Sequence, residues 1–307
     1  MCSNTLKFSI IIPTYNRPNR LELCLQSIAQ LNYPSHCFEV IIVDDGSHMP
    51  LNPITEKFTS SLPLRLIQQQ NAGPASARNT GAASAQGNYL VFTDDDCQPA
   101  SDWLMSLSDA YQKVPNALVG GRTINALPNN LYSTASQLLI DYIYDYYNQT
   151  PKEATFFASN NFAMPRTLYQ QLQGFDTSFP LAAGEDREFC DRWRHHGFPM
   201  HYAPAMQLNH AHMLTLGSFW QQHVNYGRGA FHFHRVRSQR HSQPMQVEPF
   251  AFYFRLLTYP FTRHQGKRAL SLSALFFLSQ VANVVGFAWE KYKQHSLASP
   301  VTAISSS

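Results

Sequence analysis

An apolar run that ends in three consecutive carboxylates constrains the fold of this chain more than any other feature. Residues 89–92 (Tyr-Leu-Val-Phe) have the composition of a buried strand, and Asp94, Asp95 and Asp96 follow one residue later. Like charges repel one another, and burying them unpaired is costly. The run therefore indicates either an acidic turn in solvent or carboxylates that bind a divalent cation, Mg²⁺ or Mn²⁺, both of which prefer hard oxygen ligands.

Two more acidic clusters favour the cation site over the turn. The apolar residues 40–43 run directly into Asp44 and Asp45, and Glu185 and Asp186 open an expected helix. The carboxyl ends of parallel strands meet at one edge of a sheet, where open α/β sheets bind their ligands. The sequence therefore predicts that these carboxylates gather at one sheet edge.

The chain alternates between strand-like and helix-like segments. Strands are expected at residues 8–12, 40–43, 64–67, 89–92, 117–120 and 201–202, and helices at residues 18–31, 74–85 and 102–113. This alternation predicts βαβ units and therefore an α/β fold with a mostly parallel, Rossmann-like sheet flanked by helices. With 307 residues, of which 44% are hydrophobic and 14% charged, the chain can build a sizeable core, and general disorder is not expected.

Charge and cysteine content narrow the functional classes. The formal net charge is only +3 and no long basic run occurs, so nucleic acid is not an expected partner. The five cysteines lack CxxC spacing, which favours reduced thiols in a cytoplasmic protein. The N-terminus has no apolar signal region, so secretion of the catalytic part is not expected.

Five motifs, in order along residues 8–230, together resemble the family 2 glycosyltransferases, which have a GT-A fold. The motifs are Pro13-Thr14-Tyr15-Asn16-Arg17, Val43-Asp44-Asp45-Gly46-Ser47, Asn71-Ala72-Gly73-Pro74-Ala75-Ser76-Ala77-Arg78-Asn79, Phe92-Thr93-Asp94-Asp95-Asp96 and Gly184-Glu185-Asp186. The resemblance implies an inverting, nucleotide-sugar-dependent enzyme with a glycosyltransferase domain at residues 1–235. Its nucleotide-sugar half would span about 1–121 and its acceptor half about 122–235. Beyond this domain, the sequence itself predicts a C-terminal hydrophobic helical appendage at residues 236–307 with a disordered tail from Leu297 to Ser307.

The same resemblance assigns the donor pocket. Asp44 would receive the base edge of a uracil-like ring, since a carboxylate accepts an N–H in a charge-assisted bond, which favours a UDP-sugar donor. Pro13 and Tyr15 would line the base pocket, and Asp45 would be structural. Arg78 would either bind the nucleotide or hold the acidic loops together.

A divalent cation, Mn²⁺ or Mg²⁺, is the implied cofactor. Asp94 and Asp96 would bind it, with Asp96 the preferred direct ligand, and the ion would act as a Lewis acid on the donor diphosphate. Asp94 would also reach the ribose of the nucleotide sugar. Asp95, the middle residue, belongs to the expected nucleotide-sugar site, although strand alternation would turn it away from its neighbours. GT-A enzymes often use a late histidine as a further ligand, which makes His210 and His212 candidates.

Inverting transfer needs a base that takes the proton of the acceptor hydroxyl. Glu185 and Asp186 are the candidates, and the family pattern favours Asp186. A helix N-terminus lowers the pKa of a carboxylate, whereas burial and neighbouring acids raise it, and the sequence leaves open which effect is larger. Processive polysaccharide synthases of the family carry a Gln-x-x-Arg-Trp signature, which residues 221–229 lack. Transfer of single sugars is therefore expected.

The C-terminal part suggests a membrane. Residues 270–289 contain no charged residue across about the length that spans a bilayer, but serine, glutamine and asparagine dilute the run. Basic residues flank both ends, so no orientation follows. A helix at the membrane interface, a true span and a buried helix stay open as alternatives. The aromatic residues 250–254 suit an interface, so the expected location is the cytoplasm, at the cytoplasmic face of a membrane.

These observations predict metal-assisted, non-processive transfer of a sugar from a nucleotide-diphosphate donor to a glycan, lipid-linked or cell-envelope acceptor. Two alternatives use the same acidic residues. A nucleotidyl or phosphoryl transferase would release pyrophosphate, whereas sugar transfer releases a nucleoside diphosphate. A catalytically silent nucleotide-sugar-binding module would keep its function when Asp186 is replaced by asparagine.

Overall fold

A computed structural model describes residues 7–150, 154–179, 183–242, 245 and 248–298. The chain divides into two compact units, which we describe separately: unit 1 contains residues 1–178 and 185–214, and unit 2 contains residues 179–184 and 215–307. The expected division at residue 235 between a sugar-transfer domain and an appendage stays a prediction, because compactness and not activity defines these units.

The core of unit 1 is an eight-stranded sheet in the order β3-β2-β1-β4-β7-β6-β8-β5. The strands are β1 (Phe8–Thr14), β2 (Phe38–Asp44), β3 (Leu64–Gln68), β4 (Tyr89–Thr93), β5 (Cys97–Pro99), β6 (Leu118–Asn125), β7 (Asn161–Pro165) and β8 (Met200–His210). Four neighbouring pairs are parallel, and the pairs β4-β7, β7-β6 and β8-β5 are antiparallel. The expected α/β class is confirmed, and the sheet is mixed because β7 lies between two of the parallel groups.

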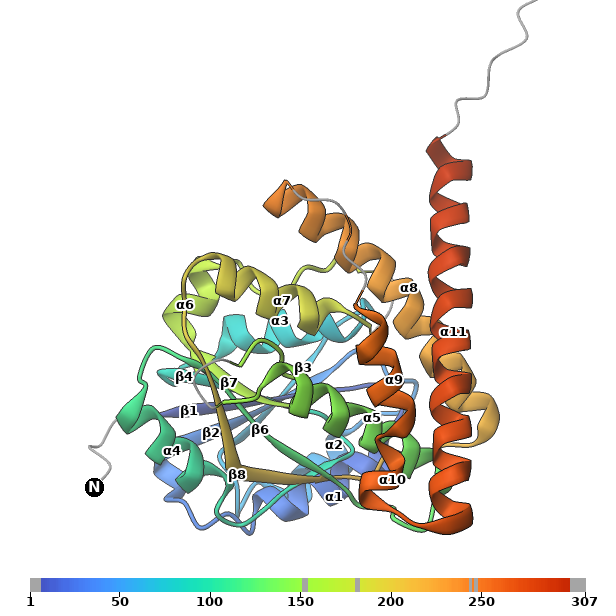
Figure 1. The fold of residues 1–307 in the computed structure, drawn as a ribbon. Helices are drawn as coiled ribbons and strands as arrows, with labels where there is room; N and C mark the ends of the chain where they lie inside the picture. Colours follow the sequence, from blue (N-terminus) through green and yellow to red (C-terminus); the bar gives the residue numbers. More distant parts are fainter. Residues whose placement is uncertain (1–6, 151–153, 180–182, 243–244, 246–247, 299–307) are drawn as a thin grey trace, which may run out of the picture. The chain divides into compact units, whose positions relative to one another are not determined.

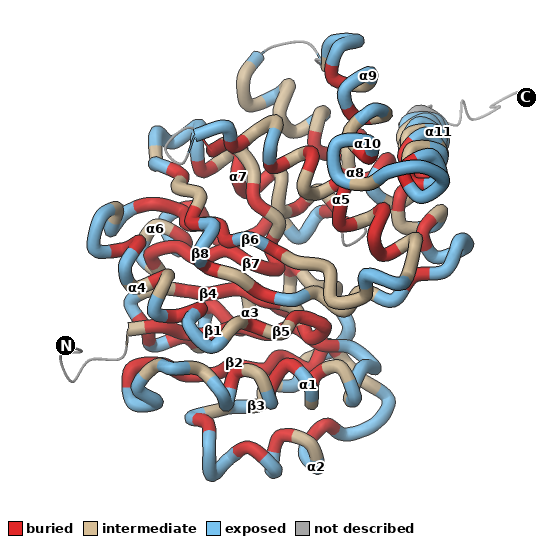
Figure 2. The backbone as a smooth tube through the Cα atoms, turned by 60° about the horizontal axis from the view of Figure 1, so that its bottom comes forward, coloured by how far each residue is buried: buried red, intermediate tan, exposed pale blue. Residues whose placement is uncertain are grey.

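Helices cover both faces of this sheet (Figure 1). They are α1 (Pro18–Ile28), α2 (Asn52–Thr55), α3 (Pro74–Ser84), α4 (Trp103–Lys113), α5 (Leu131–Tyr147), α6 (Arg166–Gln171) and α7 (Glu185–His195), with 3-10 turns at Ser35–Cys37 and Glu56–Phe58. On one face Ile10 packs with Leu25 of α1 and Trp103 of α4. On the other, Ile11 packs in a cluster with Phe189 of α7. The central strands are buried on both faces (Figure 2), so apolar residues fill their middles, as at Ile10–Ile12 in β1 and Val40–Val43 in β2.

Strand register brings the acidic segments to one edge. Parallel pairing places Thr14 at the end of β1 beside Asp44 at the end of β2. The strand β4 is parallel to β1, and its end leads into Asp94. At the other side of the sheet, antiparallel pairing of β5 with β8 sets His210 opposite Cys97. The predicted gathering of carboxylates at the carboxyl ends of β2 and β4 is therefore present.

Unit 2 is helical. Its helices are α8 (Leu216–His241), α9 (Phe250–Thr258), α10 (Pro260–Arg263) and α11 (Gly266–Ala298). Thr215 caps α8, accepting from the backbone N–H of Ser218 while the Ser218 hydroxyl accepts from the backbone of Thr215. The helices α8 and α11 pack closely, since a Cβ on Gly286 would lie 1.9 Å from the carbonyl oxygen of Val224.

The segment Gly266–Gln294 of α11 is long and apolar enough to cross a membrane. Core helices of soluble proteins also pass this test, but only 33% of the most apolar 18 residues of this segment is buried. The predicted disordered tail began at residue 297. The helix instead continues to Ala298, and residues 299–307 lie outside the described part of the chain.

Candidate functional site

The buried carboxylate of Asp95 is anchored inside the sheet edge. Thr14 Oγ1 donates to one of its oxygens (2.7 Å), and Arg17 Nη1 donates to the other (3.1 Å). Burial raises the pKa of Asp95 to about 6, although Arg17 and Thr14 oppose the shift. Both oxygens of Asp95 are therefore already bound within the protein, and its contact with a nucleotide sugar stays a prediction.

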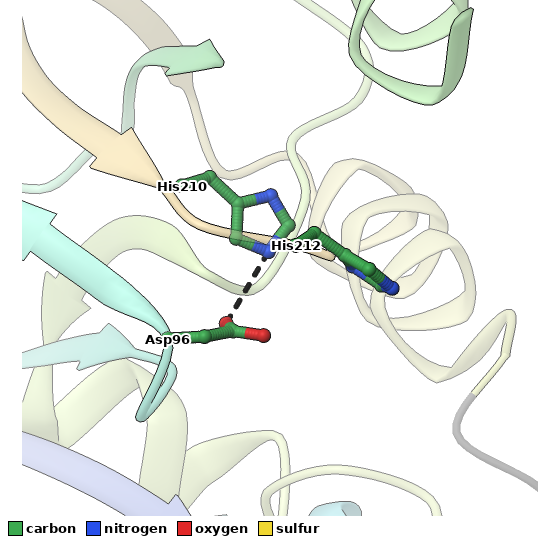
Figure 3. A group of neighbouring side chains, drawn as sticks. All are labelled: Asp96, His210 and His212. Atoms are coloured by element: carbon green, nitrogen blue, oxygen red, sulfur yellow. Dashed lines mark ion pairs between the residues drawn. The ribbon is translucent and has the colours of Figure 1, made fainter. Parts of the chain in front are cut away.

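Asp96, His210 and His212 form a compact group of three potential metal ligands (Figure 3). One donor atom from each lies within 4.8 Å of the others. His210 Nε2 lies 3.3 Å from Asp96 Oδ1, and Arg20 Nη1 donates to Asp96 Oδ2 at 2.9 Å. The backbone brings the group together, because His210 ends β8 and the N–H of the next residue, Ala211, donates to the carbonyl of Asp96 (2.9 Å). His212 lies beyond the strand end but still faces the group.

The protonation states of this group suit a cation. Burial opposes ionisation of Asp96, but the hydrogen bond and charge of His210 hold its pKa below the usual range. Burial, with the neighbouring His210, lowers the pKa of His212 to about 4, so this imidazole is neutral at pH 7. The carboxylate of Asp96, the neutral imidazole of His212 and the ring nitrogen of His210 form a donor set that transition metals such as Mn²⁺ accept. The residues present therefore fit the implied divalent ion.

Asp94 is not part of that group. It is 30% exposed, and its Oδ1 accepts from Nη2 of the buried Arg78 at 2.8 Å. Arg78 Nη1 also donates to Oε1 of the buried Glu185 at 3.2 Å. Arg78 thus links the end of β4 to the start of α7, which is one of its two expected roles. Its other expected role, a contact with the nucleotide, stays a prediction.

Glu185 and Asp186 begin α7, as expected. Burial and the adjacent Asp186 raise the pKa of Glu185 to about 7, against the charge of Arg78. Burial also raises the pKa of Asp186, although its Oδ1 accepts from the backbone N–H of Arg187 at 2.7 Å. Burial is therefore larger than the effect of the helix N-terminus, which the sequence left open. A carboxylate with a raised pKa is a stronger base.

Buried polar groups shape the expected base pocket. Asp44 Oδ1 accepts from the backbone N–H of Ser47 at 2.9 Å. Pro13 is buried in β1, whereas the Tyr15 ring is 40% exposed and lies 6.1 Å from the ring of His48. The structure thus places Pro13, Tyr15 and Asp44 at the ends of adjacent strands.

Asp45 fixes the loop that leads into α3. Its carboxylate accepts from the backbone N–H groups of Ala72 and Gly73, each at 2.9 Å, and from Gln69 Nε2 at 2.7 Å. Gly73 has a φ of +86°, a conformation that favours glycine. Asp45 therefore stabilises the loop that precedes α3, which is a structural role.

Sequence reasoning gave no role to Arg17 and Arg20, which pair with Asp95 and Asp96. Their spacing of three residues at the start of a helix was the available signal, because it places two cations on one face of the first turn.

Comparisons with known proteins agree with this geometry. The model of a family described as "Glycosyl transferase family 2" matches residues 9–173. Glycosyltransferase AglE of Haloferax volcanii is 34% identical over 130 residues, which are 41% of this chain and 43% of AglE, so the chain spans less than half of this relative's length.

Solved structures show the same fold. The mannosyltransferase PcManGT from Pyrobaculum calidifontis, in complex with GDP-Man and Mn²⁺, superposes with a TM-score of 0.60 at 19% identity, covering 96% of this chain and 81% of that one. Staphylococcus aureus TarS in complex with UDP-GlcNAc gives a TM-score of 0.54 at 16% identity, covering 95% and 92%. At these identities the likeness shows the fold alone.

Proposed function

Because the chain belongs to glycosyl transferase family 2, we propose that it transfers single sugars, with inversion, from a nucleoside-diphosphate donor to a glycan, lipid-linked or cell-envelope acceptor. The observation that carries the proposal is the grouping of Asp96, His210 and His212 at the edge where Glu185 and Asp186 begin α7. A metal-ligand set and two carboxylates with raised pKa values are the parts that such a reaction needs.

We assign Asp96, His210 and His212 as ligands of a divalent cation, Mn²⁺ or Mg²⁺. Asp94, the other expected ligand, lies outside this group and would have to exchange its bond to Arg78 to join it. Such an ion would neutralise the charge of the diphosphate leaving group. Two of the solved relatives carry different donors, GDP-Man with Mn²⁺ and UDP-GlcNAc. We favour a UDP-sugar for this chain, because Oδ1 of the buried Asp44 already accepts from the backbone of Ser47, which leaves Oδ2 for the single ring N–H of uracil.

The donor pocket would be formed by the ends of β1, β2 and β4. Pro13 and Tyr15 would line the base, and Asp94 and Arg78 would meet the ribose and the phosphates. The bonds of Arg78 to Asp94 and Glu185 use two of its five N–H donors, and its Nε has no hydrogen-bond partner in the described chain. Both acceptors are carboxylates, so a phosphate oxygen offers the guanidinium an equivalent partner.

Asp186 is the preferred base. Glu185 is more buried and its Oε1 already accepts from Arg78, whereas Asp186 is partly exposed and its pKa is raised by burial. In the reaction the acceptor hydroxyl gives its proton to the carboxylate of Asp186, and the acceptor oxygen bonds to the anomeric carbon. The bond from that carbon to the diphosphate oxygen breaks, which releases the nucleoside diphosphate.

We place this reaction in the cytoplasm, at the cytoplasmic face of a membrane. The support is the long, largely exposed apolar helix α11 of unit 2. A membrane location would suit a lipid-linked acceptor or one in the cell envelope.

Calorimetric titration with a panel of nucleoside diphosphates tests the donor site. Each is titrated with Mn²⁺ or Mg²⁺ and again with chelator, into the wild-type chain, Asp96→Ala and the control Asp109→Ala, which changes an exposed aspartate of α4. We expect metal-dependent binding of one nucleotide that Asp96→Ala loses and Asp109→Ala keeps. If the folded protein binds no nucleoside diphosphate, the proposal fails. Release of pyrophosphate instead of a nucleoside diphosphate in turnover assays would identify nucleotidyl transfer.

A further inference from the structure

The outward face of α11 carries an unbroken apolar stripe. Its members recur at alternate spacings of four and three residues and are exposed to solvent. They are Leu270, Ala274, Phe277, Val281, Val284 and Ala288. This spacing keeps them on one side of a helix, along about 27 Å at 1.5 Å per residue. A continuous exposed apolar surface of this length marks an interaction site.

The opposite face of α11 is already occupied within unit 2. Gly286 lies against the backbone of Val224 in α8, and one turn later Glu290 accepts from Arg228 (2.8 Å) and lies 3.1 Å from His232 Nε2. These contacts tie α11 to a helix that contains arginines and histidines. A true membrane span would carry Arg228 and its neighbours into hydrocarbon, which is unfavourable.

Charge around the stripe is of one sign. No aspartate or glutamate occurs from residue 249 to residue 289, while the exposed Lys267 precedes the stripe and the exposed Lys291 follows it. Trp289 and Tyr292, at the end of the stripe, are 64% and 74% exposed. Amphipathic aromatic rings favour the interface between lipid and water, and lysines favour anionic lipid headgroups.

We infer that the outward face of α11 docks unit 2 flat on the surface of an anionic lipid bilayer, with the helix axis in the plane of the interface and α8 on the water side. A second copy of the chain suits the stripe less well. Lys267 and Lys291 stand at opposite ends, so like charges would meet in both the parallel and the antiparallel pairing of two α11 helices. The inference depends on unit 2 alone and does not require the proposed sugar transfer.

Sedimentation of the full chain with vesicles tests the docking. One set of vesicles contains phosphatidylcholine alone and the other adds phosphatidylglycerol. We expect binding to the anionic vesicles that weakens with salt, and weaker binding to phosphatidylcholine alone. The double variant Leu270→Glu with Val284→Glu places two carboxylates on the stripe and should weaken binding at least about tenfold.

The matched control is Leu23→Glu, because Leu23 is an exposed leucine of α1 (47%) as Leu270 is of α11 (64%). This control should bind vesicles like the wild type. A second pair, Lys267→Gln with Lys291→Gln, keeps the apolar stripe and should lose mainly the salt-sensitive part of binding. All variants should bind nucleoside diphosphate like the wild type, which separates this test from that of the donor site.

Trp289 reports the orientation in a Trp220→Phe background, because Trp220 of α8 is half-buried whereas Trp103 and Trp193 are fully buried. Lipids brominated near the headgroup should quench its fluorescence more than lipids brominated deep in the acyl chain, and Trp289→Phe should remove that quenching. Three results would overturn the inference. The first is equal vesicle binding by the stripe variant and the wild type. The second is a chain that does not bind vesicles but forms a dimer that Leu270→Glu dissociates. The third is stronger quenching of Trp289 by lipids brominated deep in the acyl chain, together with resistance to extraction by alkaline carbonate, which would indicate a membrane-spanning helix.

Discussion

The substitution Arg78→Met removes the buried cation that links Asp94 to Glu185. The side chains of Arg78 and Glu185 are only 4% and 6% exposed, whereas that of Asp94 is 30% exposed. Water can solvate Asp94 once the guanidinium is gone, but Glu185 is left buried without its counter-charge. The cost of the substitution therefore lies mainly in the pair of Arg78 with Glu185.

Removing one partner of a buried ion pair costs about 3–5 kcal/mol. The raised pKa of Glu185 limits this loss of stability, because Glu185 can take up a proton. Burial and Asp186 already raise its pKa to about 7, against the charge of Arg78. Without Arg78 the pKa rises further, so a proton replaces the guanidinium as the pH falls. We expect Arg78→Met to lower the free energy of unfolding by about 3 kcal/mol at about pH 8, and by less at about pH 6.

Urea unfolding of a double-mutant cycle measures this coupling. Glu185→Gln should destabilise the wild-type chain, because Arg78 loses a carboxylate, but should stabilise Arg78→Met, because an unpaired charge disappears. The control is Lys57→Met, because the side chains of Lys57 and its partner Glu22, 2.8 Å apart, are 55% and 28% exposed, and its loss should cost about 1 kcal/mol or less. Additive effects of the Arg78 and Glu185 substitutions, or an equal loss in Lys57→Met, would refute the reasoning.

Two further predictions concern unit 2. Gly286→Ala should lower the free energy of unfolding by about 1–3 kcal/mol in chemical denaturation, because its Cβ would lie 1.9 Å from a backbone oxygen. Gly217→Ala is the matched control, since its Cβ would meet nothing closer than 3.9 Å; an equal loss there would contradict the close packing of α8 and α11. Burial lowers the pKa of His223 to about 4, below its unfolded value near 6.5. The contribution of the buried neutral ring to the free energy of unfolding is therefore fully present above pH 6.5, and it is lost as the pH falls toward 4, because only the unfolded chain takes up a proton there. Thermal unfolding should therefore show that the free energy of unfolding falls by up to about 3 kcal/mol between pH 6.5 and pH 4, and His223→Leu should abolish this fall. A pH dependence that is unchanged in His223→Leu would contradict the assignment.

The sequence predicted best the strands with an apolar run in their middle, such as Ile10–Ile12 in β1 and Val40–Val43 in β2, and it predicted only two residues of the more polar β8. The strands β5 and β7 escaped prediction, because β5 has three residues and β7 begins with Asn161. The side chain of Asn161 accepts from Trp103 Nε1 (2.9 Å) and donates to the carbonyls of Arg122 and Met206. A buried asparagine in a strand depends on such distant partners, which the local sequence does not show.

The helix α5 was also missed, although its start carried a local signal. The side chain of Asn130 accepts from the backbone N–H of Ser133 (2.9 Å), which is an ordinary N-cap. In the acidic edge, local reasoning placed the carboxylates correctly because they end strands. It could not pair Arg78 with Glu185, since the two are 107 residues apart and meet only when α7 packs on the sheet.

The partners of the two buried carboxylates at this edge differ, and this difference is why we propose a cation at Asp96 and not at Asp95. Asp95 is held by Arg17 and Thr14, so its neutralisation is complete within the described chain. At Asp96, Arg20 and Arg17 lie on the side of Oδ2, whereas Oδ1 faces His210, with His212 close by. A divalent ion at Oδ1 would bind both rings at once. We therefore expect His210→Ala and His212→Ala to lose the nucleotide binding that Asp96→Ala loses, and only where that binding depends on metal.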